Sequence, residues 1–155
     1  MRNPLPIPTQ EDWLGHKRHV DGDPFYQDFD LETAYRNFYG KTHAEAFALL
    51  VDNAIHYQED VFWMPERCIG FYLLAYVHYM DSELSHGDSD GANCFFGLVE
   101  FRSVDIRNGH PEVREAVIRT LRRVGQAQEW YGADPENYGS FAARSEACLA
   151  LLGAA

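Results

Sequence analysis

Cysteine is scarce in this chain, which has three in 155 residues: Cys68, Cys94 and Cys148. An odd number of widely spaced cysteines argues against a disulfide framework. The absence of a CxxC pair also argues against a cysteine-bound zinc site. Each cysteine lies in an apolar stretch that we expect to be helical, where a thiol is usually a small core residue.

Long hydrophobic runs are also missing. The longest extends from Cys68 to Met80 and is interrupted by His78, whereas a helix needs about 20 apolar residues to cross a bilayer. The first residues, MRNPLPIPTQEDW, contain three prolines and no apolar segment of the kind found in a secretory signal. We therefore expect a cytoplasmic protein without a membrane-spanning segment.

Familiar catalytic patterns are absent as well. No serine lies in a GxSxG motif, and no cysteine has an electropositive sequence context that would favour a thiolate. The Gly40-Lys41-Thr42 triplet is not a phosphate-binding loop, because Tyr35 stands where that motif requires glycine. The sequence therefore predicts no catalytic residue and no cofactor.

Basic residues are few, and their distribution is uneven. Residues 20–100 contain 15 acidic and 3 basic side chains, whereas residues 101–125 contain 6 basic and 3 acidic ones. The acidic span argues against nucleic-acid binding and favours a basic protein partner. Solubility alone is the alternative explanation of the negative charge.

The patterns that are present are those of helices. The length of 155 residues suits a single domain, and no pair of strands with a hairpin turn is recognisable. We predict an all-α protein over residues 1–155: a single-domain bundle of six or seven helices around an aromatic-rich central helix. An irregular, proline-containing segment, residues 1–25, precedes the bundle.

Several helix starts carry capping signals. Thr9 and Thr42 each stand three residues before an acidic side chain, as in a capping box, and Asp30 is predicted to cap a helix through Phe38. For the helix after Thr42 we predict an apolar stripe of Phe47, Leu50, Val51 and Ala54. A later helix, from Asp88 or Asp90, carries Cys94, Phe95, Leu98, Val99 and Phe101 as its apolar residues.

The stretch DSELSHGDSDGANC, residues 81–94, raises the question of a metal site. It fails as a calcium loop, because His86 and Gly97 stand where that loop needs acids. Its Asp, Ser and Gly residues are typical of a capped loop between two helices. The remaining metal hypothesis joins side chains from two helices: His56, Glu59, His78 and Asp81.

A second stretch, HYQEDVFWMPE at residues 56–66, mixes aromatic and acidic side chains. Aromatic anchors beside carboxylates are typical of a recognition surface. The binding residues that we predict on this basis are Tyr57, Glu59, Asp60, Trp63 and Glu66. The alternative is that Phe62, Trp63 and Met64 only cover the central helix.

Residues 37–80, NFYGKTHAEAFALLVDNAIHYQEDVFWMPERCIGFYLLAYVHYM, resemble a family of small acidic bacterial proteins of unknown function. In that family a GKT-EA helix, a YQED-like turn and a Y-L-A-Y helix follow one another. The resemblance implies no catalytic residue. Size and acidity are also similar to those of immunity proteins, which neutralise toxins.

Three functions remain open from the sequence. The favoured one is a protein-binding, immunity-like module that uses its acidic face. The second is a small metal-dependent enzyme with the His/carboxylate site between helices. The third is a structural module that oligomerises.

Overall fold

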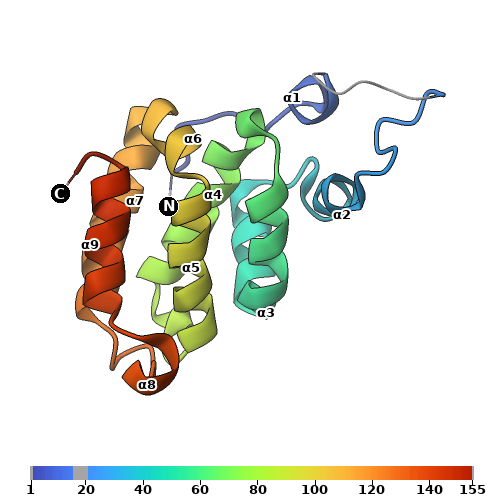
Figure 1. The fold of residues 1–155 in the computed structure, drawn as a ribbon. Helices are drawn as coiled ribbons and strands as arrows, with labels where there is room; N and C mark the ends of the chain where they lie inside the picture. The colour runs from blue at the N-terminus through green and yellow to red at the C-terminus, as the bar shows by residue number, and fades with distance from the viewer. Residues whose placement is uncertain (1, 16–20, 155) are drawn as a thin grey trace.

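The computed structural model describes residues 2–15 and 21–154 as a bundle of helices (Figure 1). The described residues form no β-strand. They form α1 (Gln10–Leu14), α2 (Phe29–Phe38), α3 (His43–Trp63), α4 (Glu66–Asp81), the 3-10 helix η1 (Glu83–Ser85), α5 (Ser89–Phe101), α6 (Ser103–Asn108), α7 (Pro111–Gln126), α8 (Pro135–Tyr138) and α9 (Phe141–Leu151). Six α-helices have ten residues or more, and α1, α6 and α8 are shorter. The all-α prediction is confirmed.

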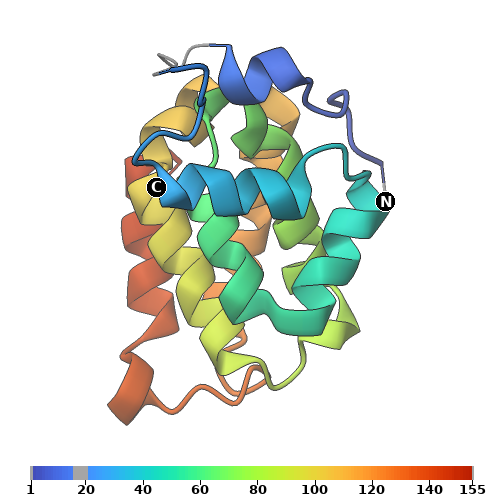
Figure 2. The ribbon, with the colours of Figure 1, turned by 90° about the vertical axis from the view of Figure 1, so that its right-hand side faces the viewer.

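The α4 helix is the centre of the bundle. Eleven of its 16 residues are buried, because it is apolar on nearly every side and must be covered all round. Its closest neighbours are α3 and α7, while α5 packs on α3 and α9 packs on α7. Figure 2 shows α2 crossing the other long helices steeply. The predicted aromatic-rich central helix is thereby confirmed.

Tyrosine side chains of α4 hold the neighbouring segments in place. Their hydroxyl groups lie in the interior, and each donates a hydrogen bond, as a buried phenol requires. The three bonds join Tyr72 to the carbonyl of Phe38 (2.7 Å), Tyr76 to the carbonyl of Gly91 (2.5 Å) and Tyr79 to Oδ2 of Asp88 (2.7 Å). They fix the end of α2 and the start of α5 against the central helix.

Most predicted helix starts are found. Thr9 and Thr42 form capping boxes at α1 and α3. Asp88 caps α5 by accepting a hydrogen bond from the Gly91 amide at 2.9 Å. The predicted capped connection between two helices is therefore present over residues 82–88, which include η1, while residues 89–94 already belong to α5. At α2 the cap is Asp28 rather than Asp30, which was the prediction. Asp30 lies in the first turn instead, where a negative charge favours the helix dipole.

The α3 helix is interrupted at Asn53, whose backbone angles are φ −157° and ψ 85°. Oδ1 of Asn53 accepts a hydrogen bond from the His56 amide at 3.1 Å, which is the cap of a restarted helix. The predicted apolar stripe assumed one continuous helix. Leu50 and Ala54 are buried, but Val51 is exposed, so that part of the stripe was wrong.

Within the N-terminal segment, residues 1–25, α1 is the short helix that the capping box at Thr9 predicts. Trp13 of α1 is fully buried and packs with Tyr35 and Tyr72. Residues 16–20 of this segment lie outside the described residues. None of the helices in the described ranges has the length and apolar character that crossing a membrane requires.

The tyrosine contacts lead to a first prediction. Tyr76→Phe removes the hydroxyl that bonds the Gly91 carbonyl, and we expect the free energy of unfolding to fall by about 1 kcal/mol. Urea denaturation measures this change. Tyr26→Phe is the matched control, because Tyr26 is exposed and its loss of a hydroxyl should change stability by less than about 0.5 kcal/mol. Equal effects of the two variants would contradict the anchoring role.

Candidate functional site

The five predicted binding residues lie in the second half of α3 and at the start of α4, but they do not all face solvent. Glu59, Trp63 and Glu66 are exposed. Tyr57 is half-buried, with its ring edge against Phe38. Asp60 is only 6% exposed. The structure therefore brings three of the five to the surface.

Asp60 has a structural contact instead. Nδ2 of Asn37 on α2 donates a hydrogen bond to Oδ2 of Asp60 at 2.8 Å. Burial raises the pKa of the Asp60 carboxyl, an effect that this hydrogen bond opposes. Asp60 therefore ties α2 to α3 and does not belong to the exposed surface.

A groove lies between α3 and α5 beside the exposed residues. It has a volume of about 320 Å³ and is lined by Gln58, Glu59, Phe62, Trp63, Cys94 and Leu98. Phe62 stacks on Phe101 with ring centroids 4.1 Å apart, and Trp63 meets Phe101 edge-on at 5.7 Å. Trp63 is 42% exposed and Phe101 is 56% exposed. We call these lining residues, together with Phe101, the α3–α5 groove.

Two further apolar side chains close to these residues in the sequence are exposed. Ile55 is 49% exposed and shares a helix face with Glu59 and Phe62, given their spacing within the second half of α3. Val104 of α6 is also exposed. Sequence reasoning missed Ile55 and Val104, and it listed Phe101 among the apolar residues of its helix without recognising that it is exposed. Periodicity along α5 could not show that Phe101 lies at the edge of the packed face.

The alternative prediction, that Phe62, Trp63 and Met64 only cover the central helix, is partly correct. Met64 is buried at 1% exposure and belongs to the core. Phe62 is half-buried and packs against the core, while Trp63 is largely accessible. One stretch of three apolar residues thus serves both packing and surface.

Two exposed carboxylates near the end of α3 have no compensating cation. Glu59 lines the groove, whereas Glu66, three residues beyond Trp63 at the start of α4, lines a separate hollow. Neither forms an ion pair within the described part of the chain. Glu100, by contrast, is paired with Arg144 at 3.2 Å. The surface therefore keeps negative charge available beside exposed aromatic rings.

Arg102 fixes the end of α3, and with it the groove. Its guanidinium is largely buried and donates to the carbonyls of Phe62 (3.1 Å) and Met64 (2.7 Å). Nε of Arg102 is also 2.7 Å from the Asp105 carboxylate. A cation at the C-terminal end of a helix satisfies its last carbonyls and favours its dipole. Arg102 therefore holds Phe62 and Trp63 at the end of α3 in place beside Phe101 at the end of α5.

The two-helix metal hypothesis finds no geometry to support it. His78 meets His43, with Nδ1 and Nε2 2.7 Å apart. Asp81 accepts hydrogen bonds from Thr120 and Arg123. Across the described residues, no three His, Cys, Asp or Glu side chains converge in a way that would hold a metal ion. His56 and Glu59 therefore do not join His78 and Asp81.

The His43–His78 contact is ordered by Asn3. Oδ1 of Asn3 accepts from the Leu5 amide at 3.1 Å, and its Nδ2 donates to the Phe71 carbonyl at 2.9 Å. These backbone partners fix the orientation of the amide, so the Asn3 nitrogen also donates to Nδ1 of His43 at 3.1 Å. His43 then carries its proton on Nε2 and donates it to Nδ1 of His78. His78 in turn carries its own proton on Nε2.

Both histidines are neutral at neutral pH. Desolvation and the neighbouring His78 lower the pKa of His43 to about 4. Desolvation also lowers the pKa of His78, although the Asp81 carboxylate opposes this effect. The tautomers described above are therefore the forms present near pH 7.

Comparison with known proteins adds no relative. No protein-family model, curated protein or solved structure matches the chain significantly. The family resemblance of residues 37–80 stays a prediction. The function is consequently argued from the residues of this chain alone.

Removal of the Arg102 guanidinium tests how the groove is held. In Arg102→Met the carbonyls of Phe62 and Met64 lose their donor, so we expect the free energy of unfolding to fall by about 2–3 kcal/mol. Chemical denaturation measures the loss. Arg107→Met on α6 is the control, since Arg107 is exposed and its removal should cost less than about 0.5 kcal/mol. A small loss in Arg102→Met would show that the guanidinium does not anchor α3.

The histidine pair predicts a pH dependence of stability. The folded-state pKa of His43, about 4, lies below its ordinary value of 6.5, so the unfolded chain binds more protons between these values. The contribution of neutral His43 to the free energy of unfolding is therefore fully present above about pH 6.5 and is lost as the pH drops toward 4.

The measurement is the free energy of unfolding from pH 7 to 4 for the wild type and His43→Gln. We expect a shallower decline in the variant, because carboxylate titration is common to both proteins. His56→Gln replaces an exposed histidine and should keep the wild-type slope. Identical slopes for the wild type and His43→Gln would overturn the prediction.

Proposed function

We propose that this protein binds a basic protein partner through the α3–α5 groove. The observation that carries the proposal is the contact of three aromatic rings, the half-buried Phe62 and the exposed Trp63 and Phe101, beside the unpaired Glu59. Aromatic side chains dominate the binding energy of protein interfaces, because they bury large areas at low entropic cost. Exposed in this way, they favour a partner that covers them.

The charge around the groove indicates the chemistry of that partner. Glu59 favours a Lys or Arg side chain next to an apolar residue that enters the groove, and Glu66 adds negative charge at the start of α4. The acidic excess over residues 20–100 adds long-range attraction, which raises the association rate more than the final affinity. A basic segment with apolar anchors therefore fits this surface, as the immunity-like role expected from the sequence would require.

A second copy of the chain suits the groove less well. It would bring the same carboxylates to the interface, and like charges across an interface cost free energy. The oligomerising module is therefore the weaker proposal. It is tested in the same experiment by the mass of the purified protein in solution.

The experiment begins with the tagged chain isolated at low salt from its own host, with co-purified proteins identified by mass spectrometry. Each candidate is then purified, and its direct binding is measured by calorimetry. For the true partner we expect Trp63→Ala and Phe101→Ala each to weaken binding at least about ten-fold. Glu59→Gln with Glu66→Gln should mainly slow association and reduce its salt dependence.

Leu84→Ala is the matched control for loss of exposed apolar surface. Leu84 is 61% exposed and lies on η1, beyond the other end of α4. Binding that Trp63→Ala and Leu84→Ala affect equally would count against the groove. A dimer of the wild type that dissociates in Trp63→Ala would replace the proposal with self-association.

A further inference from the structure

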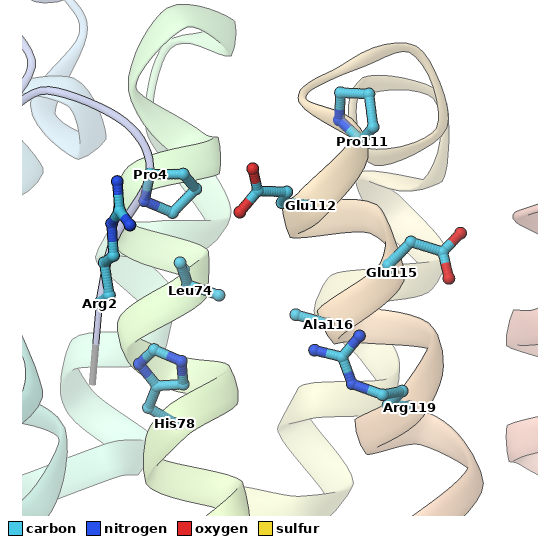
Figure 3. A pocket seen from close by; sticks show the side chains of 9 residues that line it. All are labelled: Arg2, Pro4, Leu74, His78, Pro111, Glu112, Glu115, Ala116 and Arg119. Atoms are coloured by element: carbon cyan, nitrogen blue, oxygen red, sulfur yellow. The ribbon is translucent and has the colours of Figure 1, made fainter.

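A separate hollow lies between α4 and α7, where the N-terminal residues form one wall (Figure 3). Its volume is about 310 Å³, which is in the range of small-ligand sites. Leu74 of α4, Ala116 of α7 and Pro4 supply apolar lining. Charged side chains lie around this apolar lining. Sites for small polar molecules typically combine an apolar lining with a few charged or polar groups, as this hollow does.

Two cations of the hollow have no acidic partner. Arg2 and Arg119 form no ion pair with any residue in the described ranges. Arg122 of α7 forms no ion pair with a described residue either, whereas Arg123 pairs with Asp81 at 2.9 Å. Arg2 and Arg119 differ from Arg122 in that they line the hollow. An unpaired guanidinium group at such a site favours an anionic group of a ligand.

His78 adds a neutral donor to the same wall. Its Nδ1 is occupied by the proton of His43, so its N–H is on Nε2, the opposite side of the ring. His78 lines the hollow, and Figure 3 shows its ring between the N-terminal segment and α7. No protein partner of Nε2 is found within the described residues. The Nε2–H of His78 is therefore available to donate a hydrogen bond to a ligand in the hollow. Asn3 and His43, which do not line the hollow, fix this tautomer.

An acceptor lies further toward the start of α7. Glu112 lines the hollow and forms no ion pair with another described residue. The guanidinium of Arg119 is directed back along α7 toward Ala116 (Figure 3), as side chains of a helix tend to be. Ala116 follows Glu112 by four residues, a rise of about 6 Å. Glu112 therefore lies apart from Arg119 and His78 along the hollow, whereas the guanidinium of Arg2 is directed toward the Glu112 end (Figure 3).

We propose that this hollow binds a small amino carboxylate, with its carboxylate on Arg119 and Nε2–H of His78 and its ammonium on Glu112. The planar guanidinium group of Arg119 matches a carboxylate in shape and charge. Glu112 disfavours a doubly charged phosphate and favours a ligand that also carries a positive group. Leu74 and Ala116 contact the short carbon chain between the two ends.

The test is a nuclear magnetic resonance titration of the full chain with three probes: γ-aminobutyrate, glycine and butyrate. The readouts are the backbone amide of Ala116 and the imidazole nitrogens of His78. We expect γ-aminobutyrate to bind with a dissociation constant at or below about 1 mM. Glycine should bind more weakly because it is too short to reach both ends, and butyrate because it lacks the ammonium.

Two variants separate the ends of the ligand. Arg119→Gln should weaken γ-aminobutyrate and butyrate alike, each at least about ten-fold. Glu112→Gln should weaken γ-aminobutyrate alone and thereby remove its advantage over butyrate. Arg107→Gln is the control for the loss of one exposed positive charge and should leave all three affinities unchanged.

Several results would overturn the proposal. One is the absence of shifts at Ala116 and His78 with every probe at millimolar concentration. Another is an equal loss of affinity in Arg119→Gln and Arg107→Gln, which would indicate a general charge effect. Preserved amide dispersion in each variant shows that the fold is intact, so that a loss of binding reports on the site.

Discussion

The burial of α4 is the constraint on which the rest of the structure depends. This helix is apolar or aromatic on nearly every side, so other helices have to cover it from several directions. The covering helices also have to satisfy polar atoms that α4 takes into the core. Tyr72, Tyr76 and Tyr79 do this with hydroxyl groups aimed at specific carbonyls and a carboxylate. The central helix therefore sets both the hydrophobic core and the positions of α2 and α5.

The helices that cover α4 also have faces that do not pack on it. The second half of α3 uses one face for the core and presents Phe62 and Trp63 toward α5, where Phe101 meets them. Arg102 holds this junction by bonding the last carbonyls of α3 from within. Because the junction is anchored from the inside, the outer surface is free to carry aromatic rings and unpaired carboxylates. A surface of this composition is suited to binding, whereas a purely solubilising face would be polar throughout.

The opposite side of α4 shows how distant residues determine local chemistry. Asn3 orders the proton of His43, and His43 orders that of His78. The result is a hydrogen-bond donor facing a hollow in which Arg119 has no acidic partner. Within the described residues, the two surfaces thus differ in composition: the α3–α5 groove has an unpaired carboxylate beside aromatic rings, whereas the hollow between α4 and α7 has unpaired charges of both signs.

The sequence alone determined the local features: the helical class, the capping box at Thr42, a helix start at Asp88 or Asp90 and an aromatic-rich central helix. These depend on spacing and side-chain chemistry within a few residues. Only the tertiary structure decided that Asp60 turns inward and Trp63 outward, and that His43 meets His78. Periodicity shows that a helix has an apolar and a polar face. Which residues of a helix are covered depends on contacts with segments far away in the chain, because these segments pack together around α4. A local sequence pattern does not contain that information.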